Sequence, residues 1–494
     1  MEFKIKNIQI STGDSLVVIL NEDDAKILDL HKMDRIKITY DHKSITAVID
    51  IAKKTVVPPG ELGLFEETTK SLKIKQGQKV KIDVEKKPET VCIIRRKLDG
   101  EELSYDDFKK IMEDIVAGNL TQIETTYFVA ACYSNELTTK ETIDLTRAMI
   151  DSGQILHFPD KIIMDKHCIG GVAANRTTAI VVSIIAAAGY TIPKTSSRSI
   201  TSAAGTADTI EYLCNVNMNA EELKKVVHDT KACLAWGGAL NLAPADDKII
   251  RVESPISLDP TGQLIASVLA KKRSVSANHV LIDIPVGKGA KIENRKEARI
   301  LKRKFLKVGR KLGMKIKVII TDGSHPIGNG IGPMLEARDI LWTLKNDLWG
   351  SWELKEKSIK MAGTLLKMAG HFNGESKARK IFDSGLAYKK FIEIVKAQGG
   401  KEVDPDMMET GKFYCDIISK KSGKVNHIDN KIMNKIARIA GAPNDKKAGV
   451  YLYIQKDKKI EAGTKLYTIY SDNKERLNYA VEIATKNIGV ELIH

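Results

Sequence analysis

Cysteine is scarce in this sequence and follows no pattern. Six cysteines occur among 494 residues, and none of them forms a CxxC pair or a regular spacing. Zinc sites and disulfide frameworks both require such patterns, so the sequence predicts neither of them. We therefore expect a fold that is held together by an ordinary apolar core, without a bound metal.

Long apolar runs are also absent. The longest largely apolar run extends from Ala179 to Tyr190, which is shorter than the roughly 20 residues of a membrane-spanning helix. The first residues, MEFKIKNIQI, do not show the basic and then apolar regions of a secretory signal. We therefore expect no membrane association and a cytoplasmic location.

No single stretch of the chain is expected to concentrate charge of one sign. Lys and Arg number 78 against 63 Asp and Glu, which gives a net charge of +15 at pH 7. The basic residues are spread along the chain, which favours a mixed solvated surface, and a field focused on an anionic substrate is the alternative. Because no motif of an RNA-binding domain is present, nucleic acid is not expected as a partner.

The composition is that of a folded protein with several domains. Hydrophobic residues make up 43% of the chain and charged residues 29%, and the length accommodates two to four domains. Residues 1–86 alternate apolar and polar positions in FKIK, RIKITY and KVKIDVE, as strands do, with a turn at PPGELG. We predict a β-rich domain over 1–86, which lacks residues of catalytic type and is expected to serve assembly.

The apolar spacing becomes helical after this first domain. Ser104 and Asp107 have the spacing of a capping box, apolar residues follow at helical intervals, and Gly118 ends the helix. Further helices are predicted around 128–132 and 139–149. The stretch 87–159 is therefore predicted to be a small helical domain.

The stretch from Asp165 to Glu211 has the strongest chemical signal. An apolar run leads into DKH, a pair of glycines follows, and a helix-length apolar segment begins at Thr177. A strand, a tight loop and a helix in this order direct backbone N–H groups at the loop, which suits an anion. Lys166 adds a full charge. A simple packing turn would use the same glycine pair, so both interpretations remain open.

The following loop, KTSSRSITSAAGT, brings together hydroxyl groups and one guanidinium. Ser, Thr and Arg side chains donate hydrogen bonds to phosphate oxygens, although a Ser-rich loop without a ligand is the alternative. The candidate residues are Ser196, Ser197, Arg198, Ser199, Ile200, Thr201, Ser202 and Thr206.

The rest of the chain alternates strands and helices. A helix is predicted around 220–233. Strands from Val280 and from Lys315 alternate with helices around 298–312 and 334–345, which is typical of a largely parallel sheet with a site at its strand ends. The sequence thus predicts a multidomain α/β protein, with an α/β domain over 160–420 and an α+β segment over 421–494.

Three motifs carry a resemblance to a known family. DKH-x-x-GG, SxR and GTxD-x-x-E together resemble the phosphate-binding core of the thymidine and pyrimidine-nucleoside phosphorylases, and the words SSRSITS and AGTAD resemble the archaeal AMP phosphorylase branch. The resemblance covers roughly residues 92–494. It implies that residues 245–275 return to the helical domain and that the core forms a homodimer through that domain.

The resemblance implies which residues bind phosphate. Lys166, Ser196 and Thr206 would hold inorganic phosphate, and Gly171 would line the substrate site. Thymidine phosphorylases have Ser at the position of Cys168, and because a thiol is a weak donor, backbone N–H groups would take over that contact. His167 is either an acid-base group or a structural histidine.

The base and sugar side of the site would come from the segment SLDPTGQLIASVLAKK. The resemblance places Ser267 and Lys271 there, and Asp259 is the candidate acid that protonates the departing base, provided that burial raises its pKa. Asp259 followed by Pro260 would equally make a good start for a helix, and the two roles are compatible.

A 5′-phosphate on the substrate would need a second anion site. The candidates are residues 197–202 together with Lys291, and Lys288 is the alternative to Lys291. Surface lysines at a turn would produce the same pattern, so a structural role for both remains open.

The expected function is the reversible phosphorolysis of AMP to adenine and ribose 1,5-bisphosphate, with CMP and UMP as further candidate substrates. Inorganic phosphate is a co-substrate, and no cofactor is expected. The β-rich domain would assemble the implied homodimer into a larger homo-oligomer. The first alternative is a phosphorylase of pyrimidine nucleosides such as thymidine or uridine, and the second is a non-catalytic nucleotide- or RNA-binding protein.

Overall fold

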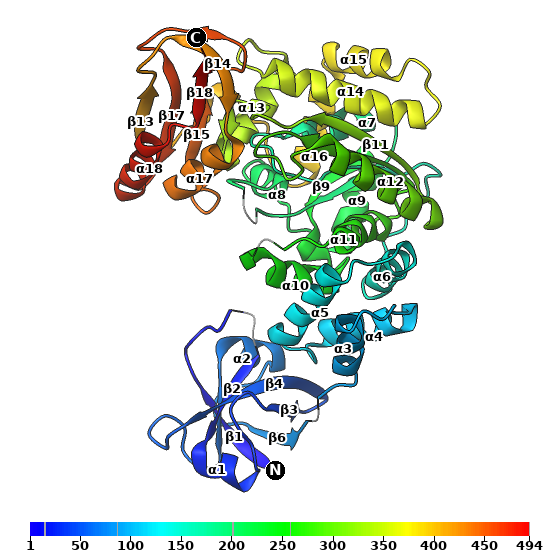
Figure 1. The fold of residues 1–494 in the computed structure, drawn as a ribbon, viewed down its shortest axis with the longest axis vertical. Coiled ribbons are helices and arrows are strands. Elements are labelled where there is room, and N and C mark those ends of the chain that lie inside the picture. The colour runs from blue at the N-terminus through cyan, green and yellow to red at the C-terminus, as the bar shows by residue number, and fades with distance from the viewer. Residues whose placement is uncertain (14–15, 86, 200–201, 257, 494) are drawn as a thin grey trace. The chain divides into compact units, whose positions relative to one another are not determined.

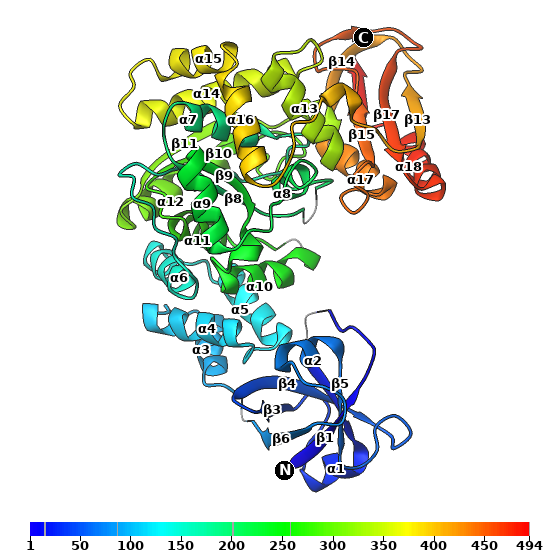
Figure 2. The ribbon, with the colours of Figure 1, turned by 180° about the vertical axis from the view of Figure 1, so that it is seen from behind.

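The computed structural model describes residues 1–13, 16–85, 87–199, 202–256 and 258–493. The chain forms two compact units, and each consists of two separate stretches of sequence. The first unit contains 1–152 and 244–264, and the second contains 153–243 and 265–494. Figures 1 and 2 show the elements of both units.

The first unit begins with a closed six-stranded barrel in the order β1-β5-β2-β4-β3-β6. Every second side chain of these strands lies inside the barrel, which buries a core of Ile, Leu and Val with Phe3. Closure pairs all strand edges. The strands are β1 (Glu2–Asn7), β2 (Val17–Asn21), β3 (Arg35–Tyr40), β4 (Lys43–Ala52), β5 (Glu61–Leu64) and β6 (Lys79–Val84), with helices α1 (Glu22–Ile27) and α2 (Glu66–Leu72) between them.

A helical bundle completes the first unit. Three of its helices start with a capping box, so their first turns are specified locally by sequence. Lys248 of the returning segment donates to the carbonyl oxygens of Ile115 and Val116, at 2.8 and 3.0 Å, at the end of α4. The elements are α3 (Thr90–Leu98), α4 (Tyr105–Ala117), α5 (Gln122–Ser134), α6 (Thr139–Asp151), α10 (Pro244–Glu253), η2 (Ser254–Ile256) and the start of α11 (Thr261–Ser274).

The second unit contains parallel strands and the helices that cover them. Strands β7 (Met164–Cys168), β10 (His279–Val286) and β11 (Lys315–Asp322) form one parallel sheet, and β8 (Ile192–Ser196) pairs with β9 (Ala232–Trp236). A parallel bridge between Ile163 and Thr191 connects the two sheets. The helices and short elements are α7 (Thr177–Ala187), α8 (Thr206–Ile210), α9 (Ala220–Thr230), η1 (Gly237–Leu240), the rest of α11, α12 (Arg295–Lys311), β12 (Gly330–Ile331), α13 (Pro333–Lys345), α14 (Trp352–Met368), α15 (Gly374–Asp383) and α16 (Leu386–Ala397).

Helix α7 is the centre of the second unit. All of its residues from Thr177 to Ala186 are buried, and α14 and α16 pack against it. A helix that is apolar on all sides can only be stable when it is surrounded in this way. Its first turn consequently occupies a fixed position at the carboxyl end of β7.

The C-terminal part of the second unit is an α+β segment. Strand β12 joins its four-stranded sheet, β12-β15-β17-β13, and a second sheet has the order β16-β14-β18. Its elements are η3 (Pro405–Met407), β13 (Phe413–Ile418), β14 (Gly423–Ile428), α17 (Asn430–Ala440), β15 (Gly449–Leu452), β16 (Lys459–Ile460), β17 (Lys465–Ser471), α18 (Lys474–Lys486) and β18 (Val490–Ile493). The predicted multidomain α/β fold with a β-rich N-terminal domain is confirmed, while the exact domain boundaries stay a prediction.

Two expectations from the sequence were wrong in detail. The helix expected around 220–233 ends at Thr230, because Lys231 adopts a left-handed conformation (φ 67°) and Cys233 lies in β9. The basic residues are also less evenly spread than expected, since nine of the 17 residues of α12 are Lys or Arg and only Glu297 is acidic. No helix of the described chain is long and apolar enough to cross a membrane.

Candidate active site

Lys166 is the central residue of β7, and its side chain reaches the first turn of α7. Its side chain is almost fully buried, and Nζ donates to the hydroxyl oxygens of Thr177 at 2.7 Å and Thr178 at 3.2 Å. Burial lowers the pKa of Lys166, because the two hydroxyls do not compensate the charge. An anion bound beside Nζ would favour the charged form of this lysine and would also meet the positive end of α7.

The glycine pair allows two loops to approach closely. Gly170 and Gly171 have φ values of 98° and 88°, in the left-handed region. A Cβ atom on Gly171 would lie 2.2 Å from the backbone nitrogen of Lys291. The structure therefore brings Gly171 and Lys291, which were both predicted as site residues, to the same place.

Cys168 faces the same loop as a neutral thiol. Its sulfur accepts a hydrogen bond from Nδ2 of Asn175 at 3.3 Å, and burial raises its pKa. The side-chain oxygen Oδ1 of Asn175 accepts in turn from the Thr177 hydroxyl at 3.2 Å. A protonated thiol is a weak donor and a poor nucleophile, so Cys168 is not suited to a covalent step.

The hydroxyl-rich loop between β8 and α8 is folded around one carboxylate. Asp208 accepts from the backbone N–H groups of Ser199 at 2.7 Å and Gly205 at 2.9 Å. The hydroxyls of Ser199 and Ser202 donate to carbonyl oxygens of the loop itself. The described residues on both sides of this loop are therefore held by bonds within the loop and to Asp208.

Three predicted phosphate-binding hydroxyls remain available at this loop. Within the described residues, the side chains of Ser196, Ser197 and Thr206 make no hydrogen bond to the protein, and none of the three is buried. Ile200 and Thr201, which were predicted to line the same site, lie outside the described residues.

Arg198 is held by carboxylates in this structure. Its guanidinium pairs with Glu211 at 2.5 Å and Asp208 at 3.1 Å, and it lies 4.7 Å from the ring centre of Trp236. The hydrogen bond from Arg198 lowers the pKa of Glu211 to about 2. Because its charge is already compensated here, the predicted contact between Arg198 and the substrate stays a prediction.

Arg176 connects the two loops. It precedes the first turn of α7, donates to the carbonyl oxygen of Ala204, and pairs with the buried Glu336 of α13. Thr209 donates to the same carboxylate at 2.7 Å. The sequence analysis did not predict this network, although the polar sequence NRTT, residues 175–178, at the start of the predicted helix indicated that polar groups gather there.

A buried ionic cluster lies beside the site. Asp165 is fully buried between Lys272 at 2.8 Å and Lys194 at 3.4 Å. Burial lowers the pKa of Lys272 to about 7, and burial together with the nearby lysines lowers that of His167 well below its usual value. A neutral His167 cannot protonate a leaving group, which favours the structural interpretation of this residue.

The candidates for the base and sugar side lie on or near α11. Ser267 and Lys271 are one turn apart on this helix, both partly exposed, and belong to the second unit. Asp259 belongs to the first unit and precedes the first turn, in which Leu264 N–H donates to the Pro260 carbonyl oxygen at 2.9 Å. The roles of these residues stay predictions.

The two candidate lysines for the 5′-phosphate differ in their surroundings. Both side chains are exposed. Lys288 pairs with Glu491 at 2.5 Å, and the backbone of Lys291 borders Gly171. The choice between the two lysines stays a prediction.

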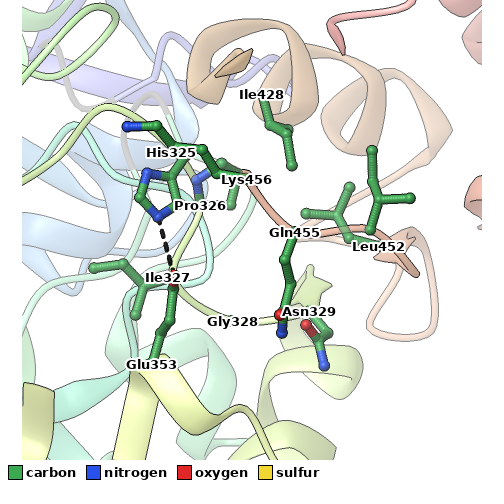
Figure 3. A pocket seen from close by; sticks show the side chains of 11 residues that line it. His325, Pro326, Ile327, Gly328, Asn329, Glu353, Ile428, Leu452, Gln455 and Lys456 are labelled. Carbon is green, nitrogen blue, oxygen red and sulfur yellow. Dashed lines mark hydrogen bonds and ion pairs between the residues drawn. The ribbon is translucent and has the colours of Figure 1, made fainter. Parts of the chain in front are cut away.

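A separate small pocket lies beyond the carboxyl end of β11. His325 Nε2 lies 3.1 Å from a carboxylate oxygen of Glu353, and Lys456 lies beside His325 (Figure 3). The other lining residues are Pro326, Ile327, Gly328, Asn329, Ile428, Leu452, Ile454 and Gln455. None of the predicted site residues lines this pocket, so the loops around Lys166 remain the candidate active site.

Comparisons with known proteins agree with this geometry. Residues 91–153 match the helical bundle domain of the glycosyl transferase family, residues 160–388 match its a/b domain, and residues 424–491 match the pyrimidine nucleoside phosphorylase C-terminal domain. Among solved structures, anthranilate phosphoribosyltransferase from Thermus thermophilus has a TM-score of 0.52 at 16% identity, covering 62% of this chain and 99% of that chain. This likeness shows the shared fold alone.

Similar sequences cover the whole chain. AMP phosphorylase 1 from Archaeoglobus fulgidus is 44% identical over 98% of this chain and 96% of the relative. AMP phosphorylases from Methanococcus aeolicus and Methanocaldococcus jannaschii are 42% and 44% identical, over 100% and 95% of this chain and 97% and 93% of the relatives. The chain therefore belongs to the AMP phosphorylase family.

Proposed function

We propose that this protein catalyses the reversible phosphorolysis of AMP. The observation that carries the proposal is the junction of the two loops that are expected to bind anions: the buried Lys166 contacts the start of α7, and Arg176 connects this region to the loop with free hydroxyls. A reaction between two anionic substrates needs two such sites close together. The relatives named AMP phosphorylase support the same substrates.

The reaction requires one bond to form and one to break. An oxygen of inorganic phosphate bonds to the anomeric carbon of the ribose while the bond to the base nitrogen breaks, which gives adenine and ribose 1,5-bisphosphate. Lys166 and the hydroxyls of Ser196 and Thr206 would hold the phosphate against the positively charged sugar of the transition state.

The departing base needs a proton. Asp259 would deliver it to adenine N7, so that the electron pair of the broken bond remains on a neutral base. Ser267 and Lys271 would contact the base and sugar, and Lys291 with residues 197–202 would hold the 5′-phosphate. This second phosphate contact would distinguish AMP, CMP and UMP from nucleosides.

The competing candidate is a pyrimidine-nucleoside phosphorylase. It is favoured by the match of residues 424–491 to a pyrimidine nucleoside phosphorylase domain and by a protein of Legionella pneumophila, 40% identical over 97% of this chain, that bears a thymidine phosphorylase name. Incubation with phosphate and, separately, AMP, CMP, UMP, adenosine, uridine or thymidine distinguishes the two. Release of adenine from AMP supports the proposal, and cleavage of nucleosides alone overturns it.

A non-catalytic RNA-binding role has one observation in its favour, the basic helix α12. It predicts tight, strongly salt-dependent RNA binding without consumption of nucleotide. The same assay excludes it as the main function if AMP is consumed.

We further propose a cytoplasmic homo-oligomer. Helix α5 exposes Ile123 and Tyr127, one turn apart and each more than half accessible, which suits a dimer contact of the helical bundle. The barrel would extend this dimer into a larger assembly. It is attached to the bundle within the first unit through Arg35, which pairs with Glu124 and donates to the Asn119 carbonyl oxygen at 2.6 Å.

A further inference from the structure

The start of α17, in the C-terminal segment, contacts the loop that follows the glycine pair. Asn430 is fully buried, and its Oδ1 accepts from the backbone N–H of Ala173 at 2.9 Å. Its Nδ2 donates to the carbonyl oxygen of Gly323 at 3.0 Å, in the loop after β11. One side chain thus connects the ends of two strands of the parallel sheet.

A second asparagine, one helical turn later, contacts the hydroxyl-rich loop. Asn434 Oδ1 accepts from the backbone N–H of Ala203 at 3.0 Å, and its Nδ2 donates to the Asn430 carbonyl oxygen at 2.9 Å. Both loops that are expected to hold anions therefore have a buried backbone N–H bonded to the same helix.

These contacts cannot easily be replaced by water. Ala173 and Ala203 are 2% and 0% exposed, and a buried N–H group without a partner is destabilising. When the asparagine side chain is shortened, the loop must move until its N–H reaches another acceptor. The position of each loop therefore depends on its asparagine.

The asparagines are not needed to start the helix. Asp429 already accepts from the N–H groups of Lys431 and Ile432, at 2.8 and 3.0 Å, and caps α17. The side chains of Asn430 and Asn434 are directed instead at neighbouring loops, which indicates a role outside α17.

We propose that Asn430 and Asn434 are positioning residues, through which the C-terminal segment sets the two substrate loops independently. Asn430 sets the position of Ala173 in the loop that follows Lys166, on the side expected to hold inorganic phosphate. Asn434 sets the position of Ala203 and Ser202 in the hydroxyl-rich loop, on the side expected to hold the nucleotide phosphate. This inference rests on the proposed phosphorolysis of AMP.

The experiment compares Asn430→Ala, Asn434→Ala and the wild-type enzyme. Asn473→Ala is the matched control, because Asn473 caps α18 in the same segment, with its side chain accepting from Arg476 N–H at 3.0 Å, and contacts neither loop. We measure kcat, the KM for phosphate, the KM for AMP and the thermal unfolding midpoint of each full-length protein.

Each of the two variants should raise the KM of a different substrate. Asn430→Ala should raise the KM for phosphate, and Asn434→Ala the KM for AMP, each by about 10- to 100-fold, because displacement by about 1 Å is sufficient for such losses. The other KM should change less than about threefold, and Asn473→Ala should leave both unchanged. Equal effects on both KM values, or effects no larger than those of Asn473→Ala, overturn the proposal.

A further variant covers the case in which an alanine variant does not fold. Asn434→Asp keeps the acceptor for Ala203 N–H, but its second carboxylate oxygen replaces the donor and faces the Asn430 carbonyl oxygen. It should raise the KM for AMP relative to wild type and change the KM for phosphate less than about threefold. A larger change in the KM for phosphate than in the KM for AMP overturns the role of Asn434.

Failure of the proposed AMP phosphorolysis can be distinguished from failure of the positioning role of Asn430. If wild-type enzyme does not cleave AMP, binding of inorganic phosphate measured by calorimetry still tests Asn430. Weaker phosphate binding by Asn430→Ala than by Asn473→Ala supports the positioning role, and equal binding by the two overturns it.

Discussion

Replacement of Gly171 by alanine tests whether the glycine pair brings the loop of Lys291 into the site. Gly170 provides a matched control, because both glycines have positive φ values, 98° and 88°. A Cβ atom on Gly170 would meet nothing within 4 Å, whereas a Cβ atom on Gly171 would lie 2.2 Å from the backbone nitrogen of Lys291.

The structure separates the two contributions to the expected loss. The left-handed conformation costs about 1–2 kcal/mol for alanine at either position. Only Gly171→Ala also requires a displacement of the neighbouring backbone, since 2.2 Å must lengthen to an ordinary contact of 3.4 Å. A shift of about 1 Å in a substrate-binding loop can lower the reaction rate about 100-fold.

We therefore expect similar thermal destabilisation of Gly170→Ala and Gly171→Ala but different kinetics. Gly171→Ala should lose about 100-fold in kcat/KM for AMP beyond the loss of Gly170→Ala, as measured by adenine release under excess phosphate. Equal kinetics of the two variants would refute the idea that contact with the Lys291 loop matters for the site.

Three further changes test the acid role of Asp259, the lowered pKa of Lys272 and the assembly role of the barrel. Asp259→Asn should lower kcat for AMP by about 10²–10⁴-fold, because asparagine has no proton to transfer, and near wild-type kinetics would leave only the helix-start role. The pKa of Lys272 is lowered to about 7 in the folded protein, so the unfolded chain binds more protons than the folded chain above pH 7. The stability of the wild type relative to Lys272→Met should therefore rise with pH between about 7 and 10. Urea unfolding at several pH values measures this difference, and a fall over that range contradicts the prediction. Deletion of residues 1–86 should give a smaller enzyme that still cleaves AMP, and an unchanged mass by light scattering would exclude an assembly role for the barrel.

The features that the sequence predicted correctly are specified by residues close together in the chain. The capping box of Ser104 and Asp107 and the end at Gly118 lie within one helix, and the structure has them as expected. The strand, glycine pair and helix around Lys166 are also contiguous, so their geometry follows from neighbouring residues. The end of α9 was missed because Lys231 adopts a left-handed conformation without the glycine that usually signals it.

The parts that could not be predicted depend on distant residues. The carboxylate that holds Arg176 comes from Glu336 of α13, 160 residues away, so sequence alone could not show that this guanidinium group is paired. The contacts of Asn430 and Asn434 were equally invisible, because an asparagine at a helix start is ordinarily interpreted as a local cap.

The bonds from α17 also determine when the site can form as the chain is made. Asn430 follows its partner Ala173 by 257 residues, and Asn434 follows Ala203 by 231. At about 5–20 residues per second, a ribosome needs roughly 12–50 seconds to reach them after the loops have been synthesised. During that interval the N–H groups of Ala173 and Ala203 lack these two acceptors, so a nascent chain that has completed its parallel strands does not yet have both loops in their final positions. Nucleotide binding should thus appear only when the C-terminal segment has left the ribosome.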